Sequence, residues 1–192
     1  MGAAARCALL ALLAAALSSG ARAGGLPHSV ATQLPSGYRP LVAQEGPDLG
    51  NGRRSLLVVV HREADTRAQP SPRPLLIFEE QQDRAYRLAA RNDHVVLRAN
   101  EGGQCDPFDP EDAADSGLAV KGRYFTVQNF VACGQHWSDY VTFRYDPRTR
   151  GWLFSSEIYT ESFPLDDKPD EVTVTRADAH RPVSFGQWRR KD

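Results

Sequence analysis

Cysteine is scarce in this 192-residue sequence, and apolar segments long enough to cross a membrane are lacking. The chain has three cysteines, one of them near the N-terminus, so a framework of several disulfides is excluded. No run reaches the about 20 apolar residues that a membrane-spanning helix needs. Recognisable catalytic motifs, such as a Gly-x-Ser-x-Gly elbow, are also missing. We therefore expect no membrane span, and no motif identifies an enzyme class or a cofactor.

Excess charge of one sign is missing as well. The formal net charge is −1, and removal of the N-terminal arginines Arg6 and Arg22 would change it to about −3. Nucleic-acid binding needs a concentrated basic face, so we do not expect a nucleic-acid partner. The one basic cluster, 189–191, lies at the C-terminus, where we expect residues 181–192 to form a frayed, solvated tail.

The N-terminus has the pattern of an export signal. Arg6 precedes a compact apolar run over residues 7–17, and Ala21 and Ala23 place small residues where a signal peptidase cleaves. We predict that residues 1–23 are a signal peptide and that the mature protein is periplasmic or secreted. Thiols tend to oxidise in those compartments.

The remaining chain predicts a mainly β protein. Residues 24–40 are rich in Gly, Pro and Ser and predict a flexible lead-in, followed by a single β domain over 41–180. Residues 56–60 form a continuous β-branched run typical of a buried central strand. Residues 123–133 alternate, and 139–145 and 152–159 predict a hairpin, with Trp152, Phe154 and Ile158 on one face. Residues 172–174 indicate an edge strand. We expect an antiparallel sandwich or twisted meander of seven to nine short strands with one short helix.

The short helix is predicted at residues 109–114. Asp109 is a suitable N-cap, Pro110 suits the first helical position, and acids fill the first turn. This segment belongs to an acidic cluster that begins at Asp106, and a solvated loop is the simplest explanation of the cluster. The cluster could also hold a cation or meet a basic partner.

Cys105 and Cys133 are the two cysteines that remain after removal of the leader, and we predict a disulfide between them. It would close a loop of about 29 residues and contribute roughly 3.5 kcal/mol in the chain-entropy model. Two alternatives stay open. The cysteines could be buried thiols, or they could join His136 in a metal site, although the spacing is unlike that of zinc-binding motifs.

Several polar residues were weighed as catalytic groups. His136 and Asp139 are three residues apart and could orient a general base, and Glu157 and Glu161 could form a carboxylate pair. Polar residues are common at strand ends, so these groups support only an alternative function, a periplasmic hydrolase using acidic residues or His136.

The segment 46–59 contains Asp48, Gly50 and Asn51 directly before an apolar strand. It resembles the Asp-x-Asn-x-Asp-Gly segment of FG-GAP-like (integrin-α-type) repeats in exported bacterial proteins of unassigned function. Segments 102–108 and 141–153 resemble further parts of these proteins. The resemblance implies a β domain outside the cytosol, with Asp48 and Asn51 as the positions that match calcium ligands. Arg53 and Arg54 oppose cation binding, and an Asx turn feeding the strand is the alternative.

The sequence thus predicts a non-enzymatic exported protein that binds a protein or an envelope polymer. One specific form is an inhibitor or immunity protein that neutralises a periplasm-acting toxin or hydrolase. We expect the binding surface on the loop 100–117 and the turn 134–137, with Asp109, Glu111, Asp112, His136 and Trp137 as binding residues. Trp137 could instead only cover the edge of the core. The sequence leaves the oligomeric state open.

Overall fold

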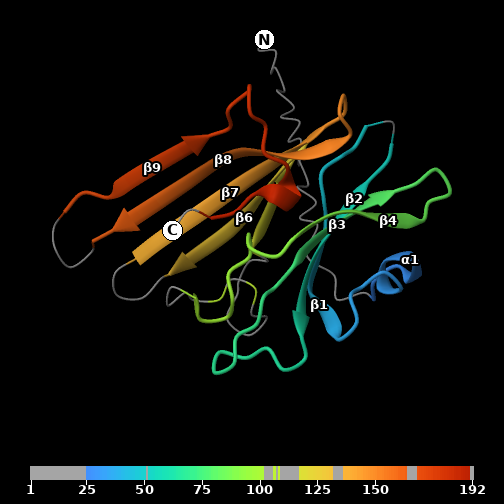
Figure 1. Ribbon diagram of the computed structural model, residues 1–192, viewed down its shortest axis with the longest axis horizontal. Helices are drawn as coiled ribbons and strands as arrows, with labels where there is room; N and C mark the ends of the chain where they lie inside the picture. Colours follow the sequence, from blue (N-terminus) through green and yellow to red (C-terminus); the bar gives the residue numbers. More distant parts are fainter. Residues whose placement is uncertain are drawn as a thin grey trace, which may run out of the picture.

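The computed structural model describes residues 25–50, 52–101, 106, 108, 117–131, 136–163 and 168–190 (Figure 1). These residues form two antiparallel sheets, each a meander in which every strand pairs with its neighbours in sequence. The first sheet contains β1 Tyr38–Glu45, β2 Ser55–Arg62, β3 Leu75–Glu80 and β4 Tyr86–Asn92. The second contains β5 Leu118–Lys121, β6 Tyr124–Val131, β7 His136–Asp146, β8 Gly151–Ser162 and β9 Glu171–Arg176. The predicted mainly β, antiparallel class with seven to nine strands is confirmed.

β2 is apolar on both faces because both faces of the first sheet are covered. Leu57 and Val59 enter the main core between the sheets. Val58 and Val60 point the other way and pack with Val30, which comes from the short helix α1 (His28–Ala31). The continuous run of residues 56–60 thus forms a central strand, as the sequence predicts.

The segment 24–40, for which we expected no regular structure, contains α1 and the first residues of β1. Val30 is fully buried, and Leu26 and Leu34 pack against the same cluster. These three residues are spaced four apart in the sequence: Val30 lies in α1, and Leu26 and Leu34 lie just before and just after it. The Gly, Pro and Ser around them hid that spacing. The predicted helix at 109–114 lies outside the described residues.

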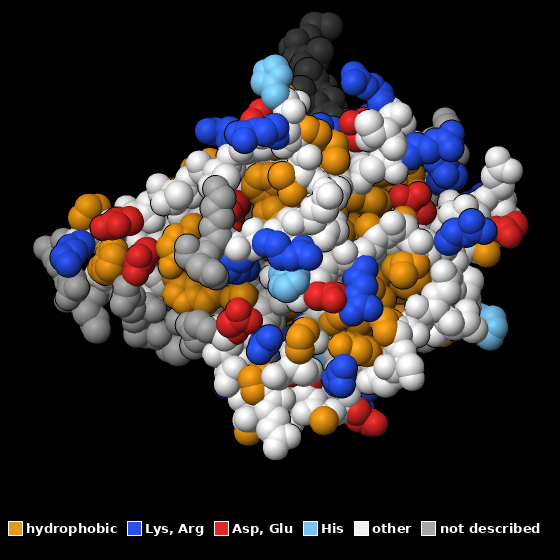
Figure 2. Space-filling view, in the orientation of Figure 1, with side chains coloured by type: hydrophobic (Ala, Val, Ile, Leu, Met, Phe, Trp, Pro, Cys, Tyr) orange, Lys and Arg blue, Asp and Glu red, His pale blue; other side chains and the backbone are white. Residues whose placement is uncertain are grey.

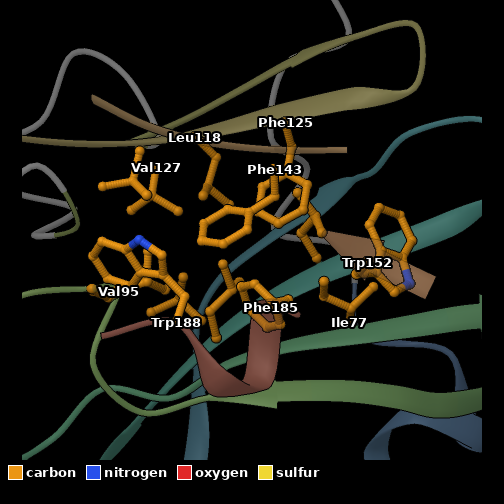
Figure 3. Close-up of a cluster of buried hydrophobic side chains, with 14 of the residues drawn as sticks. Ile77, Val95, Leu118, Phe125, Val127, Phe143, Trp152, Phe185 and Trp188 are labelled. Atoms are coloured by element: carbon orange, nitrogen blue, oxygen red, sulfur yellow. The ribbon is translucent and has the colours of Figure 1, made fainter. Parts of the chain in front are cut away.

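The main core is aromatic and is closed by the C-terminal segment (Figure 3). Phe125 and Phe143 of the second sheet stack with ring centroids 5.3 Å apart, and Phe185 meets Phe143 edge-on at 4.9 Å. Phe185 begins the 3-10 turn η2 (Phe185–Gln187), and Trp188 follows it. The buried side chain of Asn92 donates hydrogen bonds to the carbonyl oxygens of Phe185 and Trp188.

The prediction of a frayed tail over 181–192 is therefore wrong for its described part. Phe185 is fully buried and Trp188 is 4% exposed, so residues 181–190 belong to the domain. The basic character of 189–191 suggested a solvated segment. The aromatic side chains of Phe185 and Trp188 just before it are buried, and burial of their apolar surface holds the segment against the core.

The hairpin of β7 and β8 is confirmed, with one irregularity. The register shifts opposite Thr142 and Phe143, so Ser155 is an extra residue on β8. Trp152 and Phe154 face the core, whereas Ile158 lies opposite the exposed Tyr140 and faces away from it. The expectation that these three residues share a face is wrong, because a bulge reverses the alternation of the strand beyond it.

Candidate functional site

The second sheet is longer than the first, and its inward face continues past the shared core. In Figure 1, the ends of β7, β8 and β9 project to the left of the first sheet. Along β7 the inward face passes from Phe143 and Val141, which are fully buried and apolar, to Asp139 and Trp137. β8 changes in the same way beyond its bulge. We call the group that follows the inward patch: Trp137, Asp139, Glu157, Tyr159 and Glu161.

The sheet register places these five residues on one face. Asp139 lies opposite Tyr159, Trp137 opposite Glu161, and Val141 opposite Glu157. Directly opposite residues point to the same side of a sheet, and diagonal neighbours are about 7–8 Å apart. The patch is therefore a surface of two aromatic rings and two carboxylates, with the buried Asp139 carboxylate beneath them. Figure 2 shows apolar and acidic side chains side by side over the projecting part of the sheet.

Trp137 and Tyr159 form the aromatic part of the inward patch. Their rings stack with centroids 6.4 Å apart and an interplanar angle of 23°. Trp137 is half-buried and Tyr159 is 36% exposed, so both rings keep surface available to a partner. Burial, and then the negative charge of Glu161, raises the pKa of Tyr159, which keeps its hydroxyl protonated as a hydrogen-bond donor.

Asp139 is the buried floor of the patch. Its side chain is 1% exposed and pairs with the guanidinium of Arg190 from the C-terminal segment. Burial lowers the pKa of Arg190, and its guanidinium lies 5.8 Å from the Trp188 ring centroid. Among the described residues, the second carboxylate oxygen of Asp139 has no hydrogen-bond partner.

A cleft of about 420 Å³ adjoins the patch at Glu157. Apolar side chains of Phe154 and Trp188 stack at 6.4 Å on one side of it. Its rim is charged, with residues from β9 and the segment after it, namely Arg176, Asp178, Arg181 and Arg189. The patch and the cleft together make an aromatic surface with a polar rim, which is the usual build of a protein-binding surface.

The structure separates the residues that we considered as catalytic groups. His136 lies three residues before Asp139 in the same strand, so the two side chains point to opposite faces. Asp139 is also engaged by Arg190. Glu157 and Glu161 are four strand residues apart, which separates their Cα atoms by about 13 Å. Paired glycosidase carboxyl groups are about 5–9.5 Å apart, so this spacing does not favour that chemistry.

Of the five predicted binding residues, the structure describes His136 and Trp137, which are neighbours in β7 and face opposite ways. Only Trp137 belongs to the inward patch. Asp109, Glu111 and Asp112 lie outside the described residues, and so do both members of the predicted disulfide, Cys105 and Cys133.

The Asp48 segment forms a turn. The Asp48 carboxylate accepts a hydrogen bond from the Gly50 backbone N–H at 2.7 Å, and Gly50 has a φ of 85°. This is the Asx turn that we gave as the alternative to a calcium loop. Asn51, the second candidate calcium ligand, lies outside the described residues. Within the described part of the chain, no group of three or more His, Cys, Asp or Glu residues could hold a metal ion.

Asp106 does not fit our interpretation of the acidic cluster as a solvated loop, whereas the other acidic residues of the cluster lie outside the described residues. It is buried and accepts a hydrogen bond from Arg73 at 2.6 Å, while Arg73 donates another to Asp65 at 2.7 Å. Burial lowers the pKa of Arg73, but the hydrogen bonds to Asp106 and Asp65 outweigh it and raise the pKa overall. His61 lies 3.9 Å from Asp65, and its pKa is lowered by burial and then by Arg39. This buried network joins the β2–β3 loop to the segment around Asp106.

Sequence reasoning missed Tyr159 in the patch, Arg190 beneath it, and Arg73 and Asp65 in the network. Tyr159 had a usable signal, since it lies two residues before Glu161, the hairpin partner of Trp137, but the bulge hides which way it points. Arg190 pairs with Asp139 and Arg73 pairs with Asp106, and in both pairs the residues are more than 30 positions apart. Asp65 lies only eight positions from its partner Arg73.

In the part of the chain that the structure describes, no helix is long and apolar enough to cross a membrane. Comparisons with protein-family models, with curated proteins and with solved structures find no match for this chain.

Proposed function

We propose that this protein is a non-enzymatic exported binding protein and that it binds a protein partner through the inward patch. The observation that carries the proposal is the stacked pair of Trp137 and Tyr159, half-exposed and set among carboxylates on the projecting part of the second sheet. Trp and Tyr are enriched among the residues that contribute most to protein–protein binding, because they offer large rigid surfaces with one polar group.

The charge of the patch favours a basic partner surface. Glu157 and Glu161 flank the rings, and their carboxylate oxygens are hydrogen-bond acceptors. A Lys or Arg side chain can both donate to these oxygens and stack on an aromatic ring. Acidic side chains elsewhere in the sequence, Asp109, Glu111 and Asp112, stay candidates for the same partner. An inhibitor or immunity protein that neutralises a toxin or hydrolase with a basic surface is the specific form of this proposal.

Affinity capture from envelope extract tests the proposal. The mature protein serves as bait, and the captured protein is then purified and its dissociation constant measured by calorimetry. Trp137→Ala and Tyr159→Ala should each weaken binding at least about ten-fold, as truncation of a central aromatic residue does. Binding should also weaken as salt is raised, since the contacts with acidic residues are screened.

Tyr124→Ala is the matched control. Tyr124 is a 45% exposed aromatic residue of the same sheet, but it faces outward. This variant should bind like the wild type. Equal loss in all three variants would point to a general effect of the sheet, and no loss at Trp137 or Tyr159 would refute the inward patch as the binding surface. Hydrolysis of the captured partner or of an envelope polymer would instead favour the alternative, a hydrolase.

A further inference from the structure

β9 is an edge strand with a regular ladder to β8. It pairs with β8 from Ser156–Arg176 to Glu161–Glu171 without a shift in register. No described residue pairs with its other edge, and five of its six residues are exposed. Long, flat and exposed edges are templates for pairing with another strand.

The hydrogen bonds between β9 and β8 show which backbone groups of β9 point toward the open edge. Ala177 donates its backbone N–H to the Ser155 carbonyl at 2.9 Å. Bonded positions recur at every second residue of an antiparallel pair, so residues 171, 173 and 175 also bond to β8. The N–H and C=O groups of residues 170, 172, 174 and 176 therefore point away from the sheet.

We propose that β9 pairs edge to edge with β9 of a second copy of this chain. The two-fold axis is perpendicular to the sheet and passes midway between Thr173 and Thr173 of the second copy. The strands run antiparallel, and two five-stranded sheets become one continuous sheet of ten strands. The inference does not rest on the proposed function, because the edge of β9 does not include the inward patch and shares only Arg176 with the charged rim of the cleft.

Side-chain complementarity selects this register. With Thr173 opposite its copy, Val172 lies opposite Val174 of the second copy, and Asp170 lies opposite Arg176 of the second copy. These are all even-numbered positions, whose backbone groups face the open edge, so the pairing also forms a hydrogen-bonded ladder. Each apolar contact and each ion pair occurs twice in the dimer.

The neighbouring registers are opposed by charge. Centring the axis on Val172 puts Lys168 opposite Arg176 of the second copy. Centring it on Val174 puts Asp170 opposite Asp178 of the second copy. Like charges directly opposite one another are destabilising, so the arrangement centred on Thr173 is favoured over both.

An exposed apolar row on the outward face supports the same pairing. Tyr140, Ile158 and Val174 lie directly opposite one another across β7, β8 and β9, and they are 38%, 40% and 44% exposed. In the dimer this row continues into Val172 of the second copy. Lys168 and Pro169 lie just before the strand, and Lys and Pro at a sheet edge oppose pairing with another chain. The competing explanation is therefore a monomer whose edge is protected by these two residues.

Sedimentation velocity of the mature protein, from micromolar to millimolar concentration, tests the dimer. The wild type should associate reversibly. Arg176→Glu places two like-charged pairs at the interface and should raise the dimer dissociation constant by about ten-fold or more. Asp170→Arg should do the same, and the double variant Asp170→Arg with Arg176→Asp should restore the wild-type constant. Lys121→Glu, an exposed charge reversal at the opposite edge of the same sheet, should have no effect.

A cross-link tests the register. Thr173→Cys brings two introduced thiols face to face at a non-hydrogen-bonded pair, where Cβ atoms approach to about 4.5–5.5 Å. Mild oxidation should give a covalent dimer joined through this peptide, identified by mass spectrometry. Thr175→Cys should not, because its two-fold mate lies four positions away along the strand. A wild type that stays monomeric at every concentration overturns the proposal, and so does a dimer that is insensitive to Arg176→Glu or unlinked by Thr173→Cys.

Discussion

Arg73 lies between two buried carboxylates, Asp65 and Asp106, and its side chain is 5% exposed. Each Asp uses its other oxygen to accept a backbone N–H, from Ser71 and from Phe108 respectively. A buried charge is tolerated when it is paired and fully hydrogen-bonded, and this network meets that condition. Its role is to hold two loops in one arrangement.

Arg73→Met should therefore lower the free energy of unfolding by about 3–5 kcal/mol, because two carboxylates are left buried without their cation. Chemical denaturation followed by circular dichroism measures the change. The control is Arg181→Met, since Arg181 is 88% exposed in its pair with Asp178 and should contribute no more than about 1 kcal/mol. Similar losses in the two variants would show that the buried network is not a special source of stability.

Individual site residues could be predicted from sequence only where the signal is local. Trp137 was a candidate because a large aromatic residue follows a Gly-containing turn, and it lies in the inward patch. Asp48 has a local turn signal, and its Asx turn is present. The roles of Tyr159 and Arg190 could not be predicted, because each depends on a contact with a residue far away in the sequence. Tyr159 stacks on Trp137, 22 positions away, and Arg190 pairs with Asp139, 51 positions away.

Among the elements, β8 was predicted as a strand, but the direction of its side chains was not. The alternating sequence predicts a strand, and the structure has one at Gly151–Ser162. The extra residue Ser155 then reverses the two faces, so that Glu157 and Tyr159 turn inward and Ile158 turns outward. A bulge has no reliable signature in a single sequence, although its position decides which residues form the patch.

The C-terminal segment is the second such element. η2 contributes one of the fully buried side chains of the main core, and the chain around it is fixed by Phe154, whose N–H bonds to the Val183 carbonyl at 2.9 Å. Arg190 then reaches Asp139 beneath the inward patch. The segment thus links the stability of the core to the shape of the patch.

We expect Phe185→Ala to destabilise the protein by about 3–5 kcal/mol, the usual cost of emptying a buried phenylalanine site. Thermal or urea unfolding measures the loss, and Val183→Ala is the control, since Val183 is 38% exposed. Partner binding, measured on the folded fraction, should also weaken, because Arg190 is displaced from Asp139. A loss below about 1 kcal/mol would mean that the segment docks only loosely.

For the whole molecule, the fold class was accessible from sequence and the arrangement was not. Short alternating runs, Pro- and Gly-containing turns and the lack of long amphipathic segments together favour antiparallel sheets. The division into two meanders, with the second longer than the first, depends on contacts between distant residues such as Ile77 and Phe185 within one core. The projecting end that carries the patch follows from this division and could not be foreseen.

Export and the disulfide are whole-molecule properties that one measurement tests together. Asp106, the residue after Cys105 in the sequence, is buried. β6 ends at Val131, two residues before Cys133 in the sequence. We predict that the exported protein lacks residues 1–23 and carries a bond between Cys105 and Cys133. Its intact mass should equal that of residues 24–192 less two hydrogens, and neither thiol should react with an alkylating agent before reduction.

The energetic signature of that bond is non-additive. Cys105→Ser and Cys133→Ser should each lower stability by roughly 3.5 kcal/mol, because either change releases the same loop of about 29 residues. The double variant should cost no more than the larger single loss, since one bond cannot be removed twice. Independent buried thiols would instead give losses that add and would both be alkylated after unfolding without reductant. A product that retains Met1 would contradict export, and with it the oxidising environment on which the bond depends.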